Sequence, residues 1–216
     1  MIEKYVFIVT YGRSGSTLLQ AVLNSIQGYC IRGENNLAIL PLYRSTQRLL
    51  KAKQDYRVKP IPSNHPWYGL DNIDLDRYTR SLVDAFVTNV LIPPADCRVC
   101  GFKEIRYYAA EEITELLDFF RTAFTDSRIV FNTRDALAVA RSRWNAKMDQ
   151  AAVVESVHRM DAVFADYQAK HPEQTYLVLY DQYAKDPSKL EGLFDFLGEA
   201  FDPVIVGRVL SEKLMH

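Results

Sequence analysis

The stretch Tyr5-Val-Phe-Ile-Val-Thr-Tyr-Gly-Arg-Ser-Gly-Ser-Thr-Leu-Leu19 runs from an apolar segment through a short turn of glycines and hydroxyl-bearing residues into a helical pattern. The backbone N–H groups and the positive dipole end at the start of a helix favour a phosphate or sulfate group. Gly12 and Gly15 let the backbone approach such an anion, and Arg13 adds a permanent cation. Hydroxyls come from Ser14, Ser16 and Thr17. We therefore predict a P-loop-like strand, loop and helix that bind a nucleotide-type ligand.

The composition of this loop departs from that of an ATP or GTP site. A loop for triphosphates reads G-x-x-x-x-G-K-[ST], in which the lysine reaches the outer phosphates and the hydroxyl holds magnesium. Here only Arg13 and Ser14 separate the two glycines, and the lysine is missing. The loop keeps a phosphate cradle without the parts that handle a triphosphate and its metal. The alternative interpretation is that these small residues only cap a helix.

A second segment, Arg128-Ile-Val-Phe-Asn-Thr-Arg-Asp-Ala-Leu-Ala-Val-Ala-Arg-Ser-Arg-Trp144, repeats the order of apolar strand, polar turn and helical pattern. Arg134 stands at the turn and Ser142 follows on the helical pattern. Two turns of helix would separate them by roughly 12 Å, a distance at which both side chains can share one ligand. Alternatively, Arg134 and Asp135 form only a local cap or ion pair.

Together the two segments resemble the sulfotransferase superfamily, whose donor is 3′-phosphoadenosine 5′-phosphosulfate. Two further stretches agree with it: Val99-Cys-Gly-Phe-Lys-Glu-Ile-Arg-Tyr-Tyr108 is similar to the strand that ends in a lysine near the transferred group, and the stretch 176–198 is similar to the later strand, Asp-Pro turn and Leu-Gly helix. The resemblance implies a site without a metal and adenosine 3′,5′-bisphosphate as product. It assigns the 5′-phosphosulfate to the first loop and the 3′-phosphate to Arg134 and Ser142. The implied donor-binding residues are Gly12, Arg13, Ser14, Gly15, Ser16, Thr17, Leu18, Arg134 and Ser142.

Glu34 is the predicted catalytic base, because sulfuryl transfer to a hydroxyl or amine requires removal of the acceptor's proton. It follows a short apolar segment, 29–33, and its position resembles that in the Glu-using carbohydrate, tyrosylprotein and bacterial members of the superfamily. Cytosolic aryl and steroid enzymes use a histidine instead, but no equivalent strand end carries one of His65, His158 or His171. The alternative is that Glu34 is an exposed neighbour of a helix N-cap.

The predicted stabilisers of the leaving phosphate are Lys103 and Arg13, two cations that can neutralise the oxygen bridging sulfur and phosphorus. Lys103 could instead be a solvated strand end paired with Glu104. Arg32 and Arg106 are nearby cations to which the sequence assigns no role.

The composition indicates a soluble enzyme rather than a nucleic-acid-binding protein. The chain has 216 residues, with 26 Lys and Arg against 27 Asp and Glu and a net charge of −1. A duplex-binding protein needs a concentrated basic face, which this sequence lacks. No apolar run reaches the roughly 20 residues of a membrane span, and no N-terminal signal is visible. Three cysteines favour a reducing compartment over a disulfide framework, so we expect a cytoplasmic protein.

Apolar segments of strand length alternate with helical patterns, which predicts a single α/β domain with a central parallel sheet flanked by helices. The five expected strands are 5–10, 29–32, 98–103, 128–133 and 175–180. Helices are expected over 151–169, with a core-facing stripe, and over 75–92, ended by Pro93-Pro94. The stretch 37–74 reads as an ordered loop that is either an acceptor-side lid or a plain connector. Many members of the superfamily have a basic, glycine-containing loop that closes over the donor. Gly207 and Arg208 are either a remnant of this loop or part of a helix, since they fall in a helical pattern, and the sequence leaves donor closure open.

The sequence leaves the acceptor, the oligomeric state and the adenine contacts open. The acceptor is expected to be a small molecule or a carbohydrate. Trp144 either stacks on the adenine base or belongs to the core. Two rival functions remain: a small-molecule kinase, for which Asp135 and Asp181 would have to hold magnesium, and a nucleotide-binding module without turnover.

Overall fold

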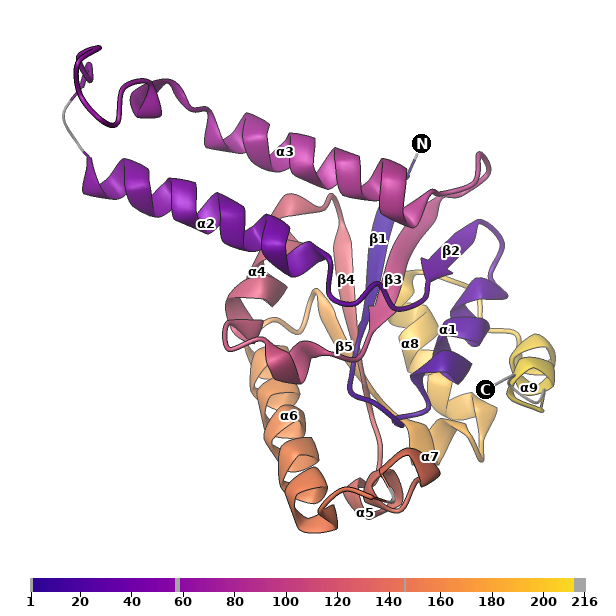
Figure 1. Ribbon diagram of the computed structural model, residues 1–216. Helices are drawn as coiled ribbons and strands as arrows, with labels where there is room; N and C mark the ends of the chain where they lie inside the picture. The colour runs from indigo at the N-terminus through magenta and orange to yellow at the C-terminus, as the bar shows by residue number, and fades with distance from the viewer. Residues whose placement is uncertain (1, 57–58, 146, 212–216) are drawn as a thin grey trace. The chain divides into compact units, whose positions relative to one another are not determined.

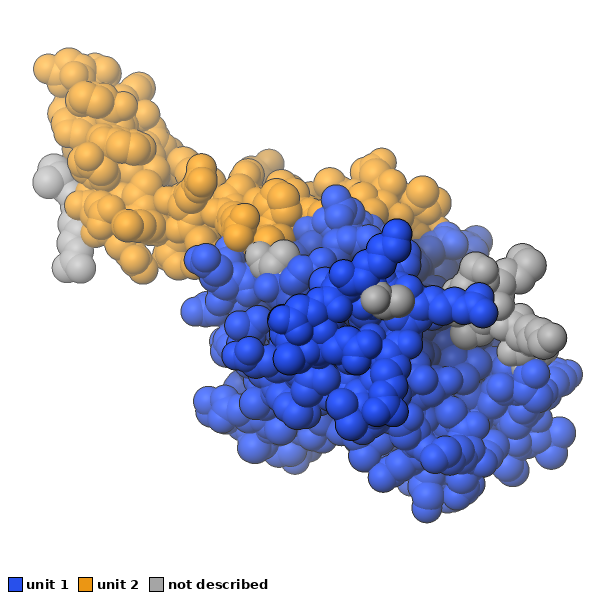
Figure 2. Space-filling view, turned by 60° about the horizontal axis from the view of Figure 1, so that its bottom comes forward, with its two compact units in different colours: residues 1–37, 93–216 blue, residues 38–92 orange. Residues whose placement is uncertain are grey.

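The computed structural model describes residues 2–56, 59–145 and 147–211, which divide into two compact units (Figures 1 and 2). One unit comprises the residues up to Leu37 and from Pro93 onward, and contains the sheet. The other comprises Ala38–Ile92 and is helical.

Five parallel strands form one sheet in the order β2-β3-β1-β4-β5 (Figure 1). Every expected strand is present within one residue at each end, and the predicted α/β class is confirmed. The strand bounds are β1 Lys4–Val9, β2 Tyr29–Arg32, β3 Val99–Glu104, β4 Ser127–Thr133 and β5 Thr175–Leu179. Because all strands run in the same direction, their carboxyl ends meet at one edge of the sheet, where open α/β sheets bind their ligands.

Helices cover both faces of the sheet, so the strands read as apolar runs rather than as alternating patterns (Figure 1). The helix bounds in this unit are α1 Ser16–Asn24, α4 Ile113–Ala123, α5 Ala136–Ala140, α6 Gln150–Lys170, α7 Tyr180–Tyr183, α8 Glu191–Leu197 and α9 Pro203–Ser211. Three short 3₁₀ turns are η3 Tyr107–Ala109, η4 Arg143–Asn145 and η5 Pro187–Leu190. The helix expected over 151–169 is α6, and its apolar stripe is buried as predicted.

The central strand β1 packs differently on its two faces. Val6 and Ile8 join a largely aliphatic hydrophobic cluster with residues of α1, α8 and α9. Phe7 points to the other face, where its ring centroid lies 4.6 Å from that of Phe120 and 5.2 Å from that of Phe102. Two filled layers of core thus fix the sheet, and with it the loops at its carboxyl edge.

The second unit is built from two helices with their own contacts. Its elements are α2 Ile39–Asp55, the 3₁₀ turn η1 Leu70–Asn72, α3 Leu75–Phe86 and the π-helical turn η2 Val87–Leu91. Tyr78 Oη donates to Ser45 Oγ at 3.2 Å between α3 and α2. The helix predicted over 75–92 is confirmed as α3 followed by η2.

The prediction of a loop over 37–74 was wrong for its first half, which is α2. This helix buries only a narrow stripe, Ile39, Leu40, Tyr43 and Thr46, among many polar residues. Pro41 lies in its first turn, where backbone N–H groups lack intrahelical partners and proline is tolerated. The sequence did not predict this helix because its apolar periodicity is weak and a proline stands near its start.

Gly101 of β3 has no room for a side chain beside β1, and its substitution tests the sheet. A Cβ at this position in β3 would lie 1.7 Å from the Val6 carbonyl oxygen of β1. We expect Gly101→Ala to lower the free energy of unfolding by about 1–3 kcal/mol or more, because backbone must move. Gly207→Ala is the control, because its Cβ would meet no atom closer than 3.8 Å within a helix. Equal stability of the two variants in urea unfolding would contradict this account of the sheet.

Candidate active site

The carboxyl ends of all five strands open into one cavity of about 630 Å³. Each strand contributes to its wall: Gly12 and Arg13 follow β1, Glu34 follows β2, Lys103 lies at the end of β3 and Arg106 follows it, Arg134 follows β4, and Tyr180 follows β5. The topology therefore gathers most of the predicted site residues from distant parts of the chain into one place, although Ser14 and Ser142 do not line the cavity.

The loop after β1 presents the start of α1 to this cavity. Gly15 is the N-cap of α1 in a left-handed conformation, with φ of 80°, and no acidic residue occupies the first turn. A Cβ on Gly15 would lie 2.1 Å from the Tyr180 ring. Glycine is therefore required both by the backbone conformation and by the neighbouring ring. Apart from Ser14, all the loop residues predicted to hold the donor line the cavity: Gly12, Arg13, Gly15, Ser16, Thr17 and Leu18.

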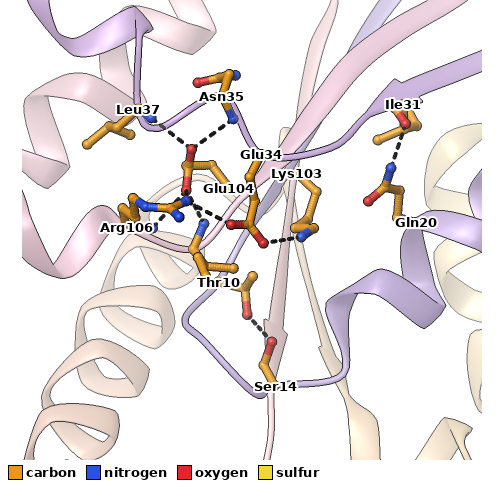
Figure 3. Close-up of polar contacts among 11 residues, drawn as sticks. Thr10, Ser14, Gln20, Ile31, Glu34, Asn35, Leu37, Lys103, Glu104 and Arg106 are labelled. Atoms are coloured by element: carbon orange, nitrogen blue, oxygen red, sulfur yellow. Dashed lines mark hydrogen bonds and ion pairs between the residues drawn. The ribbon is translucent and has the colours of Figure 1, made fainter. Parts of the chain in front are cut away.

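Ser14 is buried and anchors the loop from behind. Its Oγ is hydrogen-bonded to Thr10 Oγ1 at 2.7 Å (Figure 3), and its carbonyl oxygen accepts from Asn132 Nδ2 at 2.9 Å. Asn132 is itself held by Tyr183, whose hydroxyl donates to Asn132 Oδ1 at 2.8 Å. Sequence reasoning missed Asn132, although an amide side chain inside the apolar strand 128–133 is the kind of signal that marks a buried polar anchor.

Arg134 connects the second predicted anion-binding turn to the first. Its Nη1 donates to the Arg13 carbonyl oxygen at 2.9 Å, and its guanidinium carbon lies 4.5 Å from the centroid of the Tyr180 ring. Its backbone N–H donates to the hydroxyl of Tyr11 at 2.9 Å. The hydroxyl of Tyr11 also donates to Asp161 Oδ1 of α6 at 3.0 Å. Tyr11 is a further positioning residue that sequence reasoning did not identify.

Two polar atoms of this turn are buried without a hydrogen-bond partner among the described residues: Arg134 Nε and Ser142 Oγ. Arg134 Nε lies 3.9 Å from Asp181 Oδ1, an ion pair that is too long for a hydrogen bond. Buried polar groups are normally satisfied, because an unpaired one costs about 1–3 kcal/mol. Both atoms are therefore suited to an anionic ligand with several acceptor oxygens.

The helix expected to carry Ser142 is shorter than predicted. α5 ends at Ala140, and the Ser142 N–H donates to the Val139 carbonyl oxygen in a tighter turn. Asn145 Nδ2 donates to the same carbonyl oxygen, so a side chain competes for the helical acceptor. The separation of about two helical turns assumed from the sequence therefore does not apply.

Glu34 and Lys103 form an ion pair at the wall of the cavity (Figure 3). Lys103 Nζ donates to Glu34 Oε1 at 2.6 Å, and Arg106 Nη1 donates to Glu34 Oε2 at 2.7 Å. Burial alone would raise the pKa of Glu34, but the hydrogen bonds from Lys103 and Arg106 outweigh it and lower the pKa below its ordinary value. Glu34 is thus a carboxylate at neutral pH.

Lys103 does not behave as a surface lysine. Its side chain is 5% exposed and its partner is Glu34, so the alternative of a solvated strand end paired with Glu104 is wrong. Trp144 is 78% exposed, so the alternative that it belongs to the core is also wrong. Asp135 does act as a local cap, since its Oδ1 accepts from the Ala138 N–H at 2.8 Å.

Glu104 is the organising residue that the sequence did not reveal. Its side chain has no exposed surface, and both carboxylate oxygens accept hydrogen bonds. Oε2 accepts from the N–H groups of Asn35 (3.2 Å) and Leu37 (2.8 Å), and Oε1 from those of Ile105 (2.8 Å) and Arg106 (3.1 Å) (Figure 3). The Arg106 guanidinium adds a bond of 3.0 Å to Oε1. Glu104 therefore ties the loop that carries Glu34 to the end of β3.

A model described as the sulfotransferase family matches residues 6–203 of the chain. The chain belongs to the sulfotransferase family. The family assignment agrees with the resemblance seen in the sequence. No curated protein matches this chain.

Two solved structures share its fold. A sulfotransferase domain from the Synechococcus PCC 7002 olefin synthase is 21% identical, with a TM-score of 0.59, and the match covers 94% of this chain and 76% of that chain. A sulfotransferase domain from the curacin biosynthetic pathway is 19% identical, with a TM-score of 0.57 and coverage of 93% and 75%. At these identities the likeness concerns the fold alone. Among the described residues, no helix combines the length and the apolar character that crossing a bilayer requires.

Removal of the Glu104 carboxylate tests its organising role. We expect Glu104→Ala to lower the free energy of unfolding by about 3–5 kcal/mol, because the Arg106 guanidinium and buried N–H groups lose their acceptor. Glu155→Ala, which removes an exposed carboxylate on α6, is the control and should change stability by less than about 0.5 kcal/mol. Urea unfolding of both variants measures the difference, and similar values would show that Glu104 has no such role.

Proposed function

We propose that this family member transfers a sulfuryl group from 3′-phosphoadenosine 5′-phosphosulfate to a hydroxyl or amine of a small-molecule or carbohydrate acceptor. The observation that carries the proposal is the pair of unsatisfied buried atoms, Arg134 Nε and Ser142 Oγ, in one turn. Arg134 lines the cavity that also holds Glu34 and Lys103, whereas Ser142 does not line it. A donor with a phosphate at each end of an adenosine explains why two separate anion-binding turns are needed.

The two turns have different roles in this proposal. The loop 12–18 and the start of α1 bind the 5′-phosphosulfate through backbone N–H groups and hydroxyls. Arg134 and Ser142 bind the 3′-phosphate, for which a planar guanidinium offers paired donors. The bond from Arg134 Nη1 to the Arg13 carbonyl oxygen supports this arrangement, because it couples the two turns directly.

The proposed reaction is an in-line displacement at sulfur. The Glu34 carboxylate takes the proton of the acceptor O–H or N–H as that atom forms a bond to sulfur. The bond between sulfur and the bridging oxygen breaks, and its electron pair stays on that oxygen as part of adenosine 3′,5′-bisphosphate. Lys103 and Arg13 stabilise the negative charge that develops there.

The ion pair between Glu34 and Lys103 also provides a mechanism by which donor binding makes Glu34 a stronger base. Oxygens of the phosphosulfate compete with Glu34 for the Lys103 ammonium. When Lys103 turns to the donor, Glu34 loses one of the hydrogen bonds that lower its pKa. Donor binding and activation of the base are therefore linked through one lysine.

The rival of a magnesium-dependent kinase receives no support from the two candidate carboxylates. Asp135 Oδ1 caps α5, and Asp181 Oδ2 accepts from the Asp135 N–H at 2.7 Å. Both groups serve the local structure of the turn. The cytoplasmic location expected from the sequence belongs to the same proposal, supported by three cysteines that form no disulfide.

Nucleotide binding tests the 3′-phosphate site. We expect tight binding of adenosine 3′,5′-bisphosphate without metal, weakened about 10- to 100-fold by Arg134→Ala or Ser142→Ala through loss of charge-assisted hydrogen bonds. Arg141→Ala, which removes an exposed arginine beside Ser142, is the control. Calorimetric titration measures the affinities. Equal affinity for 5′-AMP, or tighter binding of ATP with magnesium, would contradict the assignment.

Glu34→Gln tests the base. We expect turnover to fall about 100-fold or more while binding of adenosine 3′,5′-bisphosphate is retained, because the amide cannot accept the proton. A labelled-donor assay gives kcat, and calorimetry gives the product affinity. An unchanged kcat would remove Glu34 from the mechanism.

A further inference from the structure

A second cavity, of about 530 Å³, adjoins the first. The two share Gly12, Ile105, Arg106 and Trp144 as lining residues, so they meet at the mouth of the anion-binding site. The remainder of the second cavity lies between the turn after β3 and the segment from α5 to α6. Its volume is in the range of roughly 300–1,000 Å³ that is typical of small-molecule sites.

The wall of this second cavity is predominantly apolar. Residues of α5, of the following turn and of α6 supply aliphatic or aromatic side chains: Val139, Trp144, Met148, Ala152, Val153 and Val157. Val139 and Val157 are buried at its floor, whereas Tyr108, Trp144 and Met148 are 61%, 78% and 56% exposed. The large, exposed side chains of Tyr108, Trp144 and Met148 thus all line this one cavity. Exposed apolar surface gathered in this way marks a binding site.

Most polar groups of the wall are already engaged within the protein. Asn145 Nδ2 donates to the Val139 carbonyl oxygen at 3.0 Å, and Asp149 Oδ1 accepts from the Ala151 N–H at 2.9 Å. The Arg106 guanidinium bonds Glu34 and Glu104. The Tyr11 hydroxyl bonds Asp161 and the Arg134 N–H. Ser156 and the hydroxyl of Tyr108 are further polar side-chain groups of the wall.

We propose that the acceptor is an alcohol or phenol whose hydroxyl is carried on an apolar alkyl or aryl skeleton, and that this skeleton binds in the second cavity. The inference rests on the proposed sulfuryl transfer and narrows its acceptor class. The shared residues place the hydroxyl end towards the cavity of Glu34 and Lys103, while the skeleton contacts α5 and α6. A carbohydrate is rejected, because its hydroxyls would face aliphatic side chains and lose hydrogen bonds made in water.

The fluorescence of Trp144 tests this assignment without turnover. The chain has two tryptophans, and Trp67 belongs to the other unit, so Trp67→Phe leaves Trp144 as the sole emitter at 295 nm excitation. We expect octan-1-ol to shift its emission to shorter wavelength with saturation, because the ligand displaces water from an exposed indole. Methyl α-glucoside at the same concentration should leave the spectrum unchanged.

A matched pair of charge substitutions locates the effect. In the Trp67→Phe background, Met148→Glu adds a carboxylate to the apolar wall and should weaken octan-1-ol binding about tenfold or more. Gln150→Glu adds the same charge at an exposed position on α6 that does not line the cavity, and should leave the affinity unchanged. With donor present, the KM for octan-1-ol should follow the same order.

The outcomes separate the two proposals. If adenosine 3′,5′-bisphosphate binds but octan-1-ol produces no saturable shift, or Met148→Glu and Gln150→Glu behave alike, the apolar acceptor is overturned and sulfuryl transfer stands. Faster turnover of methyl α-glucoside than of octan-1-ol also overturns it. If octan-1-ol binds as expected but adenosine 3′,5′-bisphosphate does not, the cavity is an apolar binding site and the proposed function fails.

Discussion

A carboxylate without solvent exposure must be neutralised and hydrogen-bonded inside the fold, and Glu104 is such a group. Its five hydrogen bonds come from two directions: from the backbone after β2, and from the backbone and side chain after β3. Neither segment can move without leaving a buried charge unpaired. Glu34 immediately precedes Asn35, whose N–H donates the first of these bonds. The hydrogen bonds that satisfy the buried Glu104 carboxylate therefore also position Glu34, the candidate base (Figure 3).

The two candidate anion-binding turns are also held by hydrogen bonds to buried polar groups. Asn132 is fully buried and bonds the Ser14 carbonyl oxygen, while its own carbonyl oxygen accepts from Thr10 Oγ1 at 2.6 Å. The loop after β1 is therefore fixed by polar groups behind it, and its cavity-facing groups are left for a ligand. A site whose donors are oriented before binding has little reorganisation to perform during the reaction. The cavity beside this site differs, because its wall presents mainly apolar side chains rather than hydrogen-bonding groups.

Much of this architecture could be predicted because its signals are local. Each strand contains a run of apolar residues. The turn after β1 carries glycine, hydroxyl and arginine side chains within a few positions, and the turn after β4 carries an arginine. The interpretations that proved wrong concern positions where several groups compete for the same hydrogen-bond or ion-pair partner. Lys103 has a carboxylate directly after it in Glu104, yet its partner is Glu34, because Glu104 turns to backbone donors instead. The helix before Ser142 ends early because the Asn145 side chain takes a carbonyl oxygen that a longer helix would use.

The sequence by itself determined the strand, turn and helix units, the glycine- and hydroxyl-rich loop after β1 and the chemical character of the candidate residues. These depend on backbone hydrogen bonding and side-chain periodicity within short windows. Only the tertiary structure decided which charges meet, and that the exposed Trp144 and Met148 border an apolar cavity. Glu34 lies 69 positions from Lys103 and 72 from Arg106, so their contact depends on β2 and β3 being neighbours in a parallel sheet. Strand order results from the packing of the whole core, and no short stretch of sequence contains it.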